Sequence, residues 1–203
     1  MSKYNKDYYF ILKPQDERLP EMTPDEDTAS TRYRFTVLPV GSKPLIFRNG
    51  ALDYQNTAKL KQIDPPPTIL FDGSNILVRD EIRDRLVGLD ISDLAIQPAI
   101  YIDHKNEWHE NYWYLTFTKY FECWDRKTSV YDVVDLEDEI RHEVYTYSLD
   151  DEKIESVQLK DRQLFKMGGT MEGNVVVHKS IASLFSIDGA VLVPIADFGV
   201  TYP

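Results

Sequence analysis

The sequence predicts an α+β fold: a mixed, mostly antiparallel sheet with a few short helices and two similar strand-helix-strand units. Three observations lead to this prediction. One segment in the middle of the chain is rich in aromatic and β-branched residues and alternates as a strand does. A pattern of strand, helix, strand and proline occurs twice. Turn-forming residues are also frequent, so we expect less helix than an average globular protein contains.

The start of the chain predicts short strands joined by a long loop. Residues 7–12 form a short apolar run, which favours a buried strand. Residues 14–31 are rich in proline, acids and hydroxyl residues, which is typical of a loop. Residues 32–39 alternate apolar and polar side chains, and this period of two predicts a second strand.

A run of three prolines, residues 65–67, is the strongest interruption in the sequence. Proline fixes φ and has no backbone N–H, so such a run fits neither a helix nor the interior of a sheet. The chain has 203 residues, enough for one large domain or two small ones. We therefore predict an N-terminal β-rich subdomain, residues 1–67, and a C-terminal α+β domain, residues 68–203.

The repeated pattern occurs in residues 75–100 and again in residues 174–195. Each copy begins with an asparagine and three aliphatic residues, continues with apolar residues four apart, and closes with a short apolar run and a proline. Apolar residues four apart lie on one face of a helix. A single duplication is too little for a solenoid, which needs at least three repeats. We instead expect two similar units around a shared sheet.

Residues 110–121 carry the longest strand signal of the chain. Alternation would place Trp113, Leu115 and Phe117 on one face and the tyrosines and threonines on the other. An acidic segment follows, and residues 154–166 predict a pair of strands or a strand and a turn.

The net charge is −11, and the chain has one cysteine. An excess of acids repels nucleic-acid phosphates and favours a basic partner, although many proteins are acidic for solubility alone. One cysteine excludes an internal disulfide, which fits a reducing compartment. The N-terminus shows no secretory signal, and no apolar run reaches the roughly 18 residues that a membrane span needs. We expect a cytoplasmic protein that binds neither membranes nor nucleic acids.

Chemistry-bearing motifs are few. His104 and His109 are five residues apart in a segment that predicts a hairpin loop, so a solvated polar loop is favoured over a metal site there. Cys123 has acidic neighbours, which oppose thiolate formation and favour a buried structural thiol over a nucleophile. The sequence contains no phosphate-binding loop and no nucleophile elbow. We therefore predict no catalytic residues, no cofactor and no metal.

The acidic segment is the leading candidate for a partner-binding surface, because a negative face would attract a basic protein. The alternative is an ordinary solvated surface. Its acids are Asp132, Asp135, Glu137, Asp138, Glu139 and Glu143. Trp and Tyr dominate binding hot spots, so Trp108, Tyr112 and Trp124 are candidate aromatic anchors, although core positions are the commoner use of such residues.

Residues 69–195 resemble the immunity-protein family of bacterial polymorphic toxin systems that was first catalogued as a domain of unknown function with a myxobacterial founding member. Three segments carry the resemblance: the strand and helix at residues 75–82, the aromatic strand that ends at Glu122-Cys123-Trp124-Asp125, and the closing segment, residues 164–195. These motifs are structural rather than catalytic, and residues 1–65 match nothing in the family.

The resemblance implies an antidote that binds a cognate secreted toxin, often a type VI effector and in prominent cases a nuclease. We expect a one-to-one complex that blocks the toxin. Two alternatives remain open at this point. The chain could be an enzyme that destroys the toxin's product, which would require a pocket of converging polar groups. It could also be a scaffold that oligomerises through sheet edges.

Overall fold

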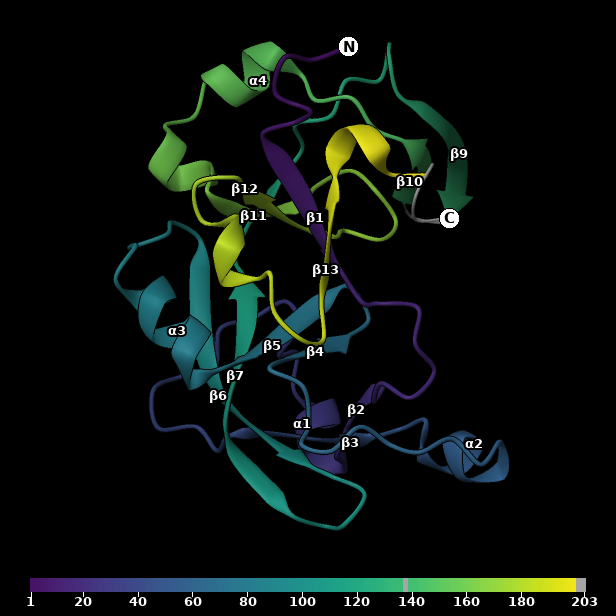
Figure 1. Ribbon diagram of the computed structural model, residues 1–203. Coiled ribbons are helices and arrows are strands. Elements are labelled where there is room, and N and C mark those ends of the chain that lie inside the picture. The colour runs from purple at the N-terminus through teal and green to yellow at the C-terminus, as the bar shows by residue number, and fades with distance from the viewer. Residues whose placement is uncertain (137–138, 200–203) are drawn as a thin grey trace.

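The computed structural model describes residues 1–136 and 139–199, and its sheets confirm the predicted α+β class. Two larger sheets stack one above the other in Figure 1, with a separate two-stranded hairpin beside the upper one. Among the described strands only two pairs are parallel, β3 with β6 and β8 with β11. Four short α-helices are described, none longer than eight residues, as expected for a chain with few helical signals.

The six-stranded sheet has the order β2-β3-β6-β7-β5-β4. Its strands are β2 (Met22–Pro24), β3 (Leu45–Asn49), β6 (Leu94–Ile102), β7 (Trp108–Phe117), β5 (Asn75–Arg79) and β4 (Ile69–Asp72). The five-stranded sheet has the order β13-β1-β12-β11-β8. Its strands are β13 (Val191–Pro194), β1 (Tyr8–Leu12), β12 (Val175–His178), β11 (Leu164–Met167) and β8 (Tyr120–Phe121). The hairpin consists of β9 (Val130–Leu136) and β10 (Glu139–Thr146).

The helical segments are short connections around these sheets. The α-helices are α1 (Glu26–Ser30), α2 (Leu52–Thr57), α3 (Asp80–Val87) and α4 (Asp151–Glu155). Three 3₁₀ segments occur at η1 (Leu159–Arg162), η2 (Ala182–Leu184) and η3 (Ile195–Asp197). Asp150 caps α4, because its side chain accepts the backbone N–H of Lys153.

The two repeated units are present, with one difference from the expectation. In each unit the two parallel strands enclose a third, antiparallel strand: β7 lies between β5 and β6, and β1 lies between β12 and β13. The units belong to different sheets, so the shared sheet we expected is wrong, but both contribute to one core. The second unit has the 3₁₀ segment η2 where the first has α3, because its connection is shorter.

That common core lies between the sheets. Strand β7 behaves as predicted: Leu115 and Phe117 pack into this core, whereas Tyr112 and Tyr114 pack on the opposite face of the six-stranded sheet. Helix α3 contributes Ile82 and Leu86, which lie four apart on its buried side. A third cluster covers the outer face of the five-stranded sheet and is centred on the fully buried Trp124.

Several predictions for the N-terminal third and the later loops are corrected. Residues 32–39 form turns and no strand; Phe35 and Val37 are exposed, and only Tyr33 is buried. The supposed loop, residues 14–31, contains β2 and α1. Residues 154–166 contain η1 and most of β11, so of the two alternatives given for this segment the strand pair is wrong. Strand pairing also joins the segments on both sides of Pro67, because β1 pairs with β12 and β13 and β3 pairs with β6. The sheets therefore give no support to a boundary there.

Candidate functional site

The predicted acidic segment forms the β9–β10 hairpin. Asp132 lies directly opposite Glu143, and the Tyr145 hydroxyl donates to Asp132 Oδ2 at 3.0 Å. This hydrogen bond to a carboxylate raises the pKa of Tyr145 to about 12. Asp135 is opposite Ile140, and the alternation of a strand places it on the other face from Asp132. The acids are thus divided between two faces of a ribbon rather than gathered on one.

Three of the predicted acids cannot be placed in the same detail. Glu137 and Asp138 lie outside the described residues. The backbone of Glu139 pairs with Leu136 at the closed end of the hairpin.

Exposed apolar side chains accompany these acids on the hairpin. Val133 is 60% exposed and Ile140 is 64% exposed, and Val130 and Tyr145 are also exposed. The same alternation places Val133 and Ile140 as neighbours on the face of Asp135, where they form a small apolar patch, whereas Val130 and Tyr145 lie on the face of Asp132. The hairpin therefore combines negative charge with apolar surface, which is the composition of a protein-binding element.

The base of the hairpin is held firmly against the body. Tyr131 and His142 each pack edge-on against the Trp124 ring, at centroid distances of 5.1 and 5.3 Å. Trp124 is itself fixed, because its indole N–H donates to the Gly168 carbonyl at 3.1 Å. Among the described strands, β9 pairs only with β10, so its outer edge carries backbone groups that no other described strand uses.

The three aromatic residues named as candidate anchors lie in different surroundings, and one of them, Trp124, is buried at the base of the hairpin and not at a surface. Trp108, at the tip of the β6–β7 hairpin, is 56% exposed. That tip lies at the bottom of Figure 1, far from β9 and β10 at the upper right, so the structure does not bring Trp108 and the acids together. Tyr112 is fully buried. Its prediction as a surface anchor is therefore wrong.

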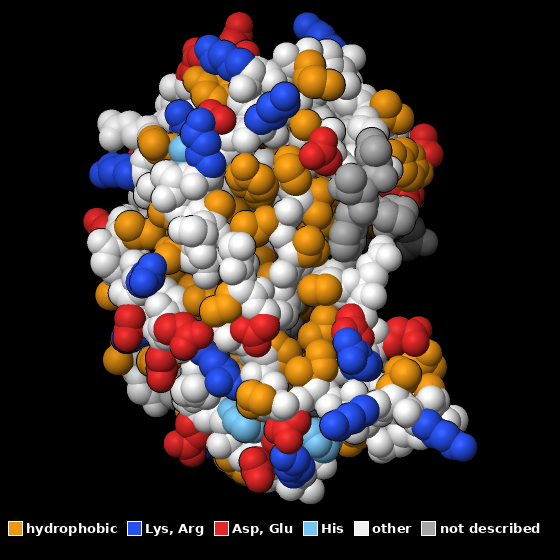
Figure 2. All heavy atoms as spheres, viewed as in Figure 1, with side chains coloured by type: hydrophobic (Ala, Val, Ile, Leu, Met, Phe, Trp, Pro, Cys, Tyr) orange, Lys and Arg blue, Asp and Glu red, His pale blue; other side chains and the backbone are white. Residues whose placement is uncertain are grey.

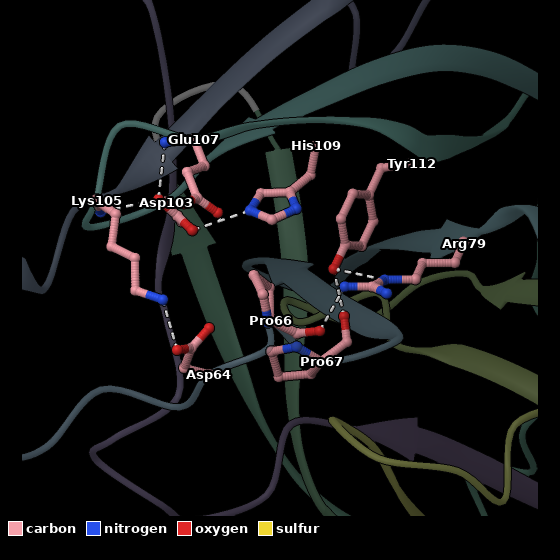
Figure 3. Close-up of polar contacts among 9 residues, drawn as sticks. All are labelled: Asp64, Pro66, Pro67, Arg79, Asp103, Lys105, Glu107, His109 and Tyr112. Atoms are coloured by element: carbon pink, nitrogen blue, oxygen red, sulfur yellow. Dashed lines mark hydrogen bonds and ion pairs between the residues drawn. The ribbon is translucent and has the colours of Figure 1, made fainter.

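Figure 3 shows what Tyr112 does instead. Its hydroxyl accepts the Arg79 Nε hydrogen at 3.0 Å and donates to the Pro67 carbonyl, while Arg79 Nη2 donates to the Pro66 carbonyl at 2.6 Å. Burial raises the pKa of Tyr112 to about 12. Because proline offers no N–H, a carbonyl is the only backbone group through which this segment can be held. Tyr112 and Arg79 thus fasten the proline run to β5 and β7.

The loop between β6 and β7 holds Asp103, Glu107 and His109 together, with one ligand atom of each within 4.8 Å of the others. Asp103 is buried and its oxygens are already used: it accepts the N–H groups of Lys105 and Glu107 at 2.8 and 2.9 Å and contacts His109 Nε2 at 2.9 Å. Burial alone would raise the pKa of Asp103, but these hydrogen bonds lower it. The arrangement is that of a loop held by an aspartate side chain.

A cationic pocket lies where the two sheets, the 169–173 loop and β10 meet. Its volume is roughly 240 Å³, and six separate segments form its wall. The charged groups in the wall are Arg34, Arg141, Lys166 and Glu172. Three positive groups against one negative group is the reverse of the balance of the whole chain, whose net charge is −11.

Lys166 is the most unusual of these groups, because only 4% of it is exposed. It lies on β11, and its ammonium donates to the Asn75 side-chain oxygen. Burial lowers the pKa of Lys166 to about 8, an effect that the carboxylate of Asp72 opposes and the guanidinium of Arg34 reinforces. A buried lysine with a shifted pKa in a pocket is a marker of a functional site.

Asp72 is the buried counter-charge behind the pocket. One of its oxygens accepts the hydroxyls of Tyr33 and Tyr114, each at 3.0 Å, and the Arg34 guanidinium bonds to both oxygens. Burial first, and then the neighbouring carboxylate, raises the pKa of Tyr33 and of Tyr114. The carboxylate is thus committed to three partners and does not bond directly to Lys166.

A second, larger pocket of roughly 640 Å³ adjoins the first, and the two share Ser74 and Glu172. Its wall is mainly apolar and includes β1, near which hydrophobic side chains gather across the middle of Figure 2. Glu143 and Glu172 both line it. Partial desolvation, and then the charge of Glu143, raises the pKa of Glu172. Hairpin and pockets therefore form one continuous region.

No protein-family model and no curated protein matches this chain. None of the helices in the described part of the chain is long and apolar enough to cross a membrane.

Sequence reasoning missed Asp72 and Lys166. The neighbouring residues in the sequence could have pointed to both. Lys166 interrupts the apolar run Leu164-Phe165-Lys166-Met167, and Asp72 ends the apolar run Ile69-Leu70-Phe71. A charge inside a buried strand needs a partner, because burying it alone is costly.

Proposed function

We propose that this chain is a non-catalytic immunity protein that binds a cognate toxin one-to-one in the cytoplasm and blocks it. The observation that carries the proposal is the β9–β10 hairpin. It joins exposed apolar residues to exposed acids on a ribbon whose base is anchored to Trp124. Such a ribbon offers a partner apolar contact and charge at the same place.

Charge complementarity supports a basic partner. Asp132, Asp135 and Glu143 are exposed on the hairpin, and the chain as a whole carries a net charge of −11. Opposite charges accelerate encounter, and desolvated apolar contacts slow dissociation. A toxin that acts on nucleic acid carries a basic groove, so the hairpin would compete with the substrate for it.

The experiment is a calorimetric titration with the purified toxin, taken as the protein encoded immediately upstream. Val133→Asp introduces a charge into the apolar patch and should weaken binding by roughly tenfold or more if Val133 becomes buried in the complex. Val40→Asp is the matched control, because Val40 is fully exposed in a turn that is not part of the hairpin. It should bind as the wild type does.

A charge-reversal pair tests the electrostatic part. Asp132→Lys should slow association about fivefold at low salt, and the difference should shrink as salt is added. Glu110→Lys makes the same change in net charge on β7 and should leave association close to wild type. If both variants of the hairpin bind the toxin normally, the docking surface is not the hairpin.

A second candidate follows from the open edge of β9, namely self-association through strand pairing. Sedimentation of the purified chain separates the two. A monomer that forms a one-to-one complex supports the immunity proposal, whereas a stable dimer abolished by Val133→Asp and no toxin binding would favour the scaffold.

A further inference from the structure

The cationic pocket has features that the proposed toxin contact does not explain. Its ammonium group contacts two separate parts of the wall, and the end of the side chain lies close to a third. Lys166 Nζ bonds to Asn75 and lies 5.3 Å from the centre of the Tyr120 ring. The neighbouring Cε lies close to Gly173, because a Cβ added to that glycine would be 3.5 Å from it. Asn75, Tyr120 and Gly173 all line the pocket. The end of the Lys166 side chain therefore lies at the pocket wall.

The ammonium is left with unused hydrogen-bonding capacity. It has three N–H donors, and within the described residues Asn75 is its only hydrogen-bond acceptor. Asn75 is neutral, and no ion pair of Lys166 within 4.0 Å occurs in the described part of the chain. The carboxylate that acts on it electrostatically, Asp72, is already occupied by Arg34 and two tyrosine hydroxyls.

A buried cation without a bonded anion is unfavourable, and an entering anion would relieve it. Arg34 adds a second positive group at the same wall. Its guanidinium gives two of its five N–H donors to Asp72, and its side chain is 45% accessible, so further donors remain for a ligand. Planar guanidinium and compact ammonium groups together are the usual recognition elements for carboxylate and phosphate.

We propose that this pocket binds a compact oxyanion, a carboxylate or phosphate group, between Lys166 and Arg34. The volume of roughly 240 Å³ is below the range of pockets for drug-sized ligands, so it suits one anionic group or a small molecule that bears it. The Lys166 amine, whose pKa is about 8, remains mostly protonated at pH 7 and so retains the charge that an anion needs. This proposal does not depend on toxin binding.

The test follows the ε-carbon of Lys166 by NMR in protein labelled with ¹³C-lysine. Inorganic phosphate and acetate are titrated separately at constant ionic strength. We expect a saturable shift of the Lys166 signal and a rise of its pKa by about one unit at saturation, because an adjacent negative charge favours the ammonium form. A response to acetate alone identifies a carboxylate site, and a response to phosphate alone identifies a phosphate site.

Two variants give the controls. Lys166→Met keeps the length of the side chain without its charge and should abolish binding and anion-dependent thermal stabilisation. Lys160→Met removes an exposed lysine on η1 and should leave both unchanged. The absence of a saturable shift with either anion up to about 50 mM, a concentration that saturates even a weak site, would overturn the proposal. Equal thermal stabilisation of wild type and Lys166→Met by the anion would also overturn it. The wild-type titration decides the question even if Lys166→Met does not fold.

Discussion

Replacing Asp72 with alanine should be among the most damaging single substitutions in this protein. The carboxylate is almost completely buried and accepts hydrogen bonds from Tyr33, Tyr114 and Arg34. Without it, two buried hydroxyls lose an acceptor, at roughly 1–3 kcal/mol each. The partly exposed Arg34 can turn toward water, so its share is smaller. Breaking such a buried charged network costs about 3–5 kcal/mol in total.

Urea unfolding, followed by tryptophan fluorescence, measures this cost. With a slope of about 2 kcal/mol per molar urea, the midpoint should fall by roughly 1.5–2.5 M. Tyr33→Phe and Tyr114→Phe each remove a single donor to Asp72 and should cost about 1 kcal/mol. Glu110→Ala removes an exposed carboxylate and should change the free energy of unfolding by less than about 0.5 kcal/mol.

A second substitution tests whether Asp72 also offsets the charge of Lys166. In Asp72→Ala the Lys166 and Arg34 cations face each other without their common carboxylate, so adding Lys166→Met should recover part of the lost stability. If the urea midpoint of Asp72→Ala lies within about 0.5 M of the wild-type midpoint, the view that this network stabilises the junction of the sheets is refuted.

Three further predictions concern single groups. The pKa of Lys166 is about 8 in the folded chain and 10.5 in an ordinary lysine, so between these pH values the unfolded chain binds one proton that the folded chain does not. The free energy of unfolding of the wild type relative to Lys166→Met should therefore rise by roughly 2 kcal/mol from about pH 8 to pH 10. A difference independent of pH would contradict the burial of a charged amine. Burial raises the pKa of the Cys123 thiol, so a thiol reagent should label it only on unfolding, and rapid labelling of the native chain would argue against its position in the core. Trp124→Ala should cost about 3–5 kcal/mol and accelerate amide exchange in β9 and β10 more than in β7; equal changes in both would show that Trp124 does not anchor the hairpin.

The elements predicted best are those in which local pattern and tertiary burial agree. In β7 the alternation of aromatic and aliphatic residues matches the two faces of the sheet, because both faces are covered. The segment 32–39 has the same alternation and no strand. Phe35 and Val37 remain in solvent there, so a period of two without a sheet to pair with does not form a strand.

The candidate site was harder to predict, because its residues are far apart in the sequence. Asp72, Arg34 and Lys166 come from three segments, and only the packing of the two sheets brings them together. Tyr112 was misplaced for a related reason. An aromatic residue with a polar tip suits both an interface and a core, and the sequence does not reveal that Pro67 offers a buried carbonyl to its hydroxyl. The resemblance to an immunity-protein family stays a prediction.

The most direct test of the proposed function is a growth rescue. The protein encoded upstream is expressed alone, with this chain, or with its Val133→Asp variant, and the complexes are then purified. The account predicts that the wild-type chain restores growth and co-purifies one-to-one with the toxin, while the variant protects less. Failure of the wild-type chain to restore growth or to co-purify would contradict the immunity proposal.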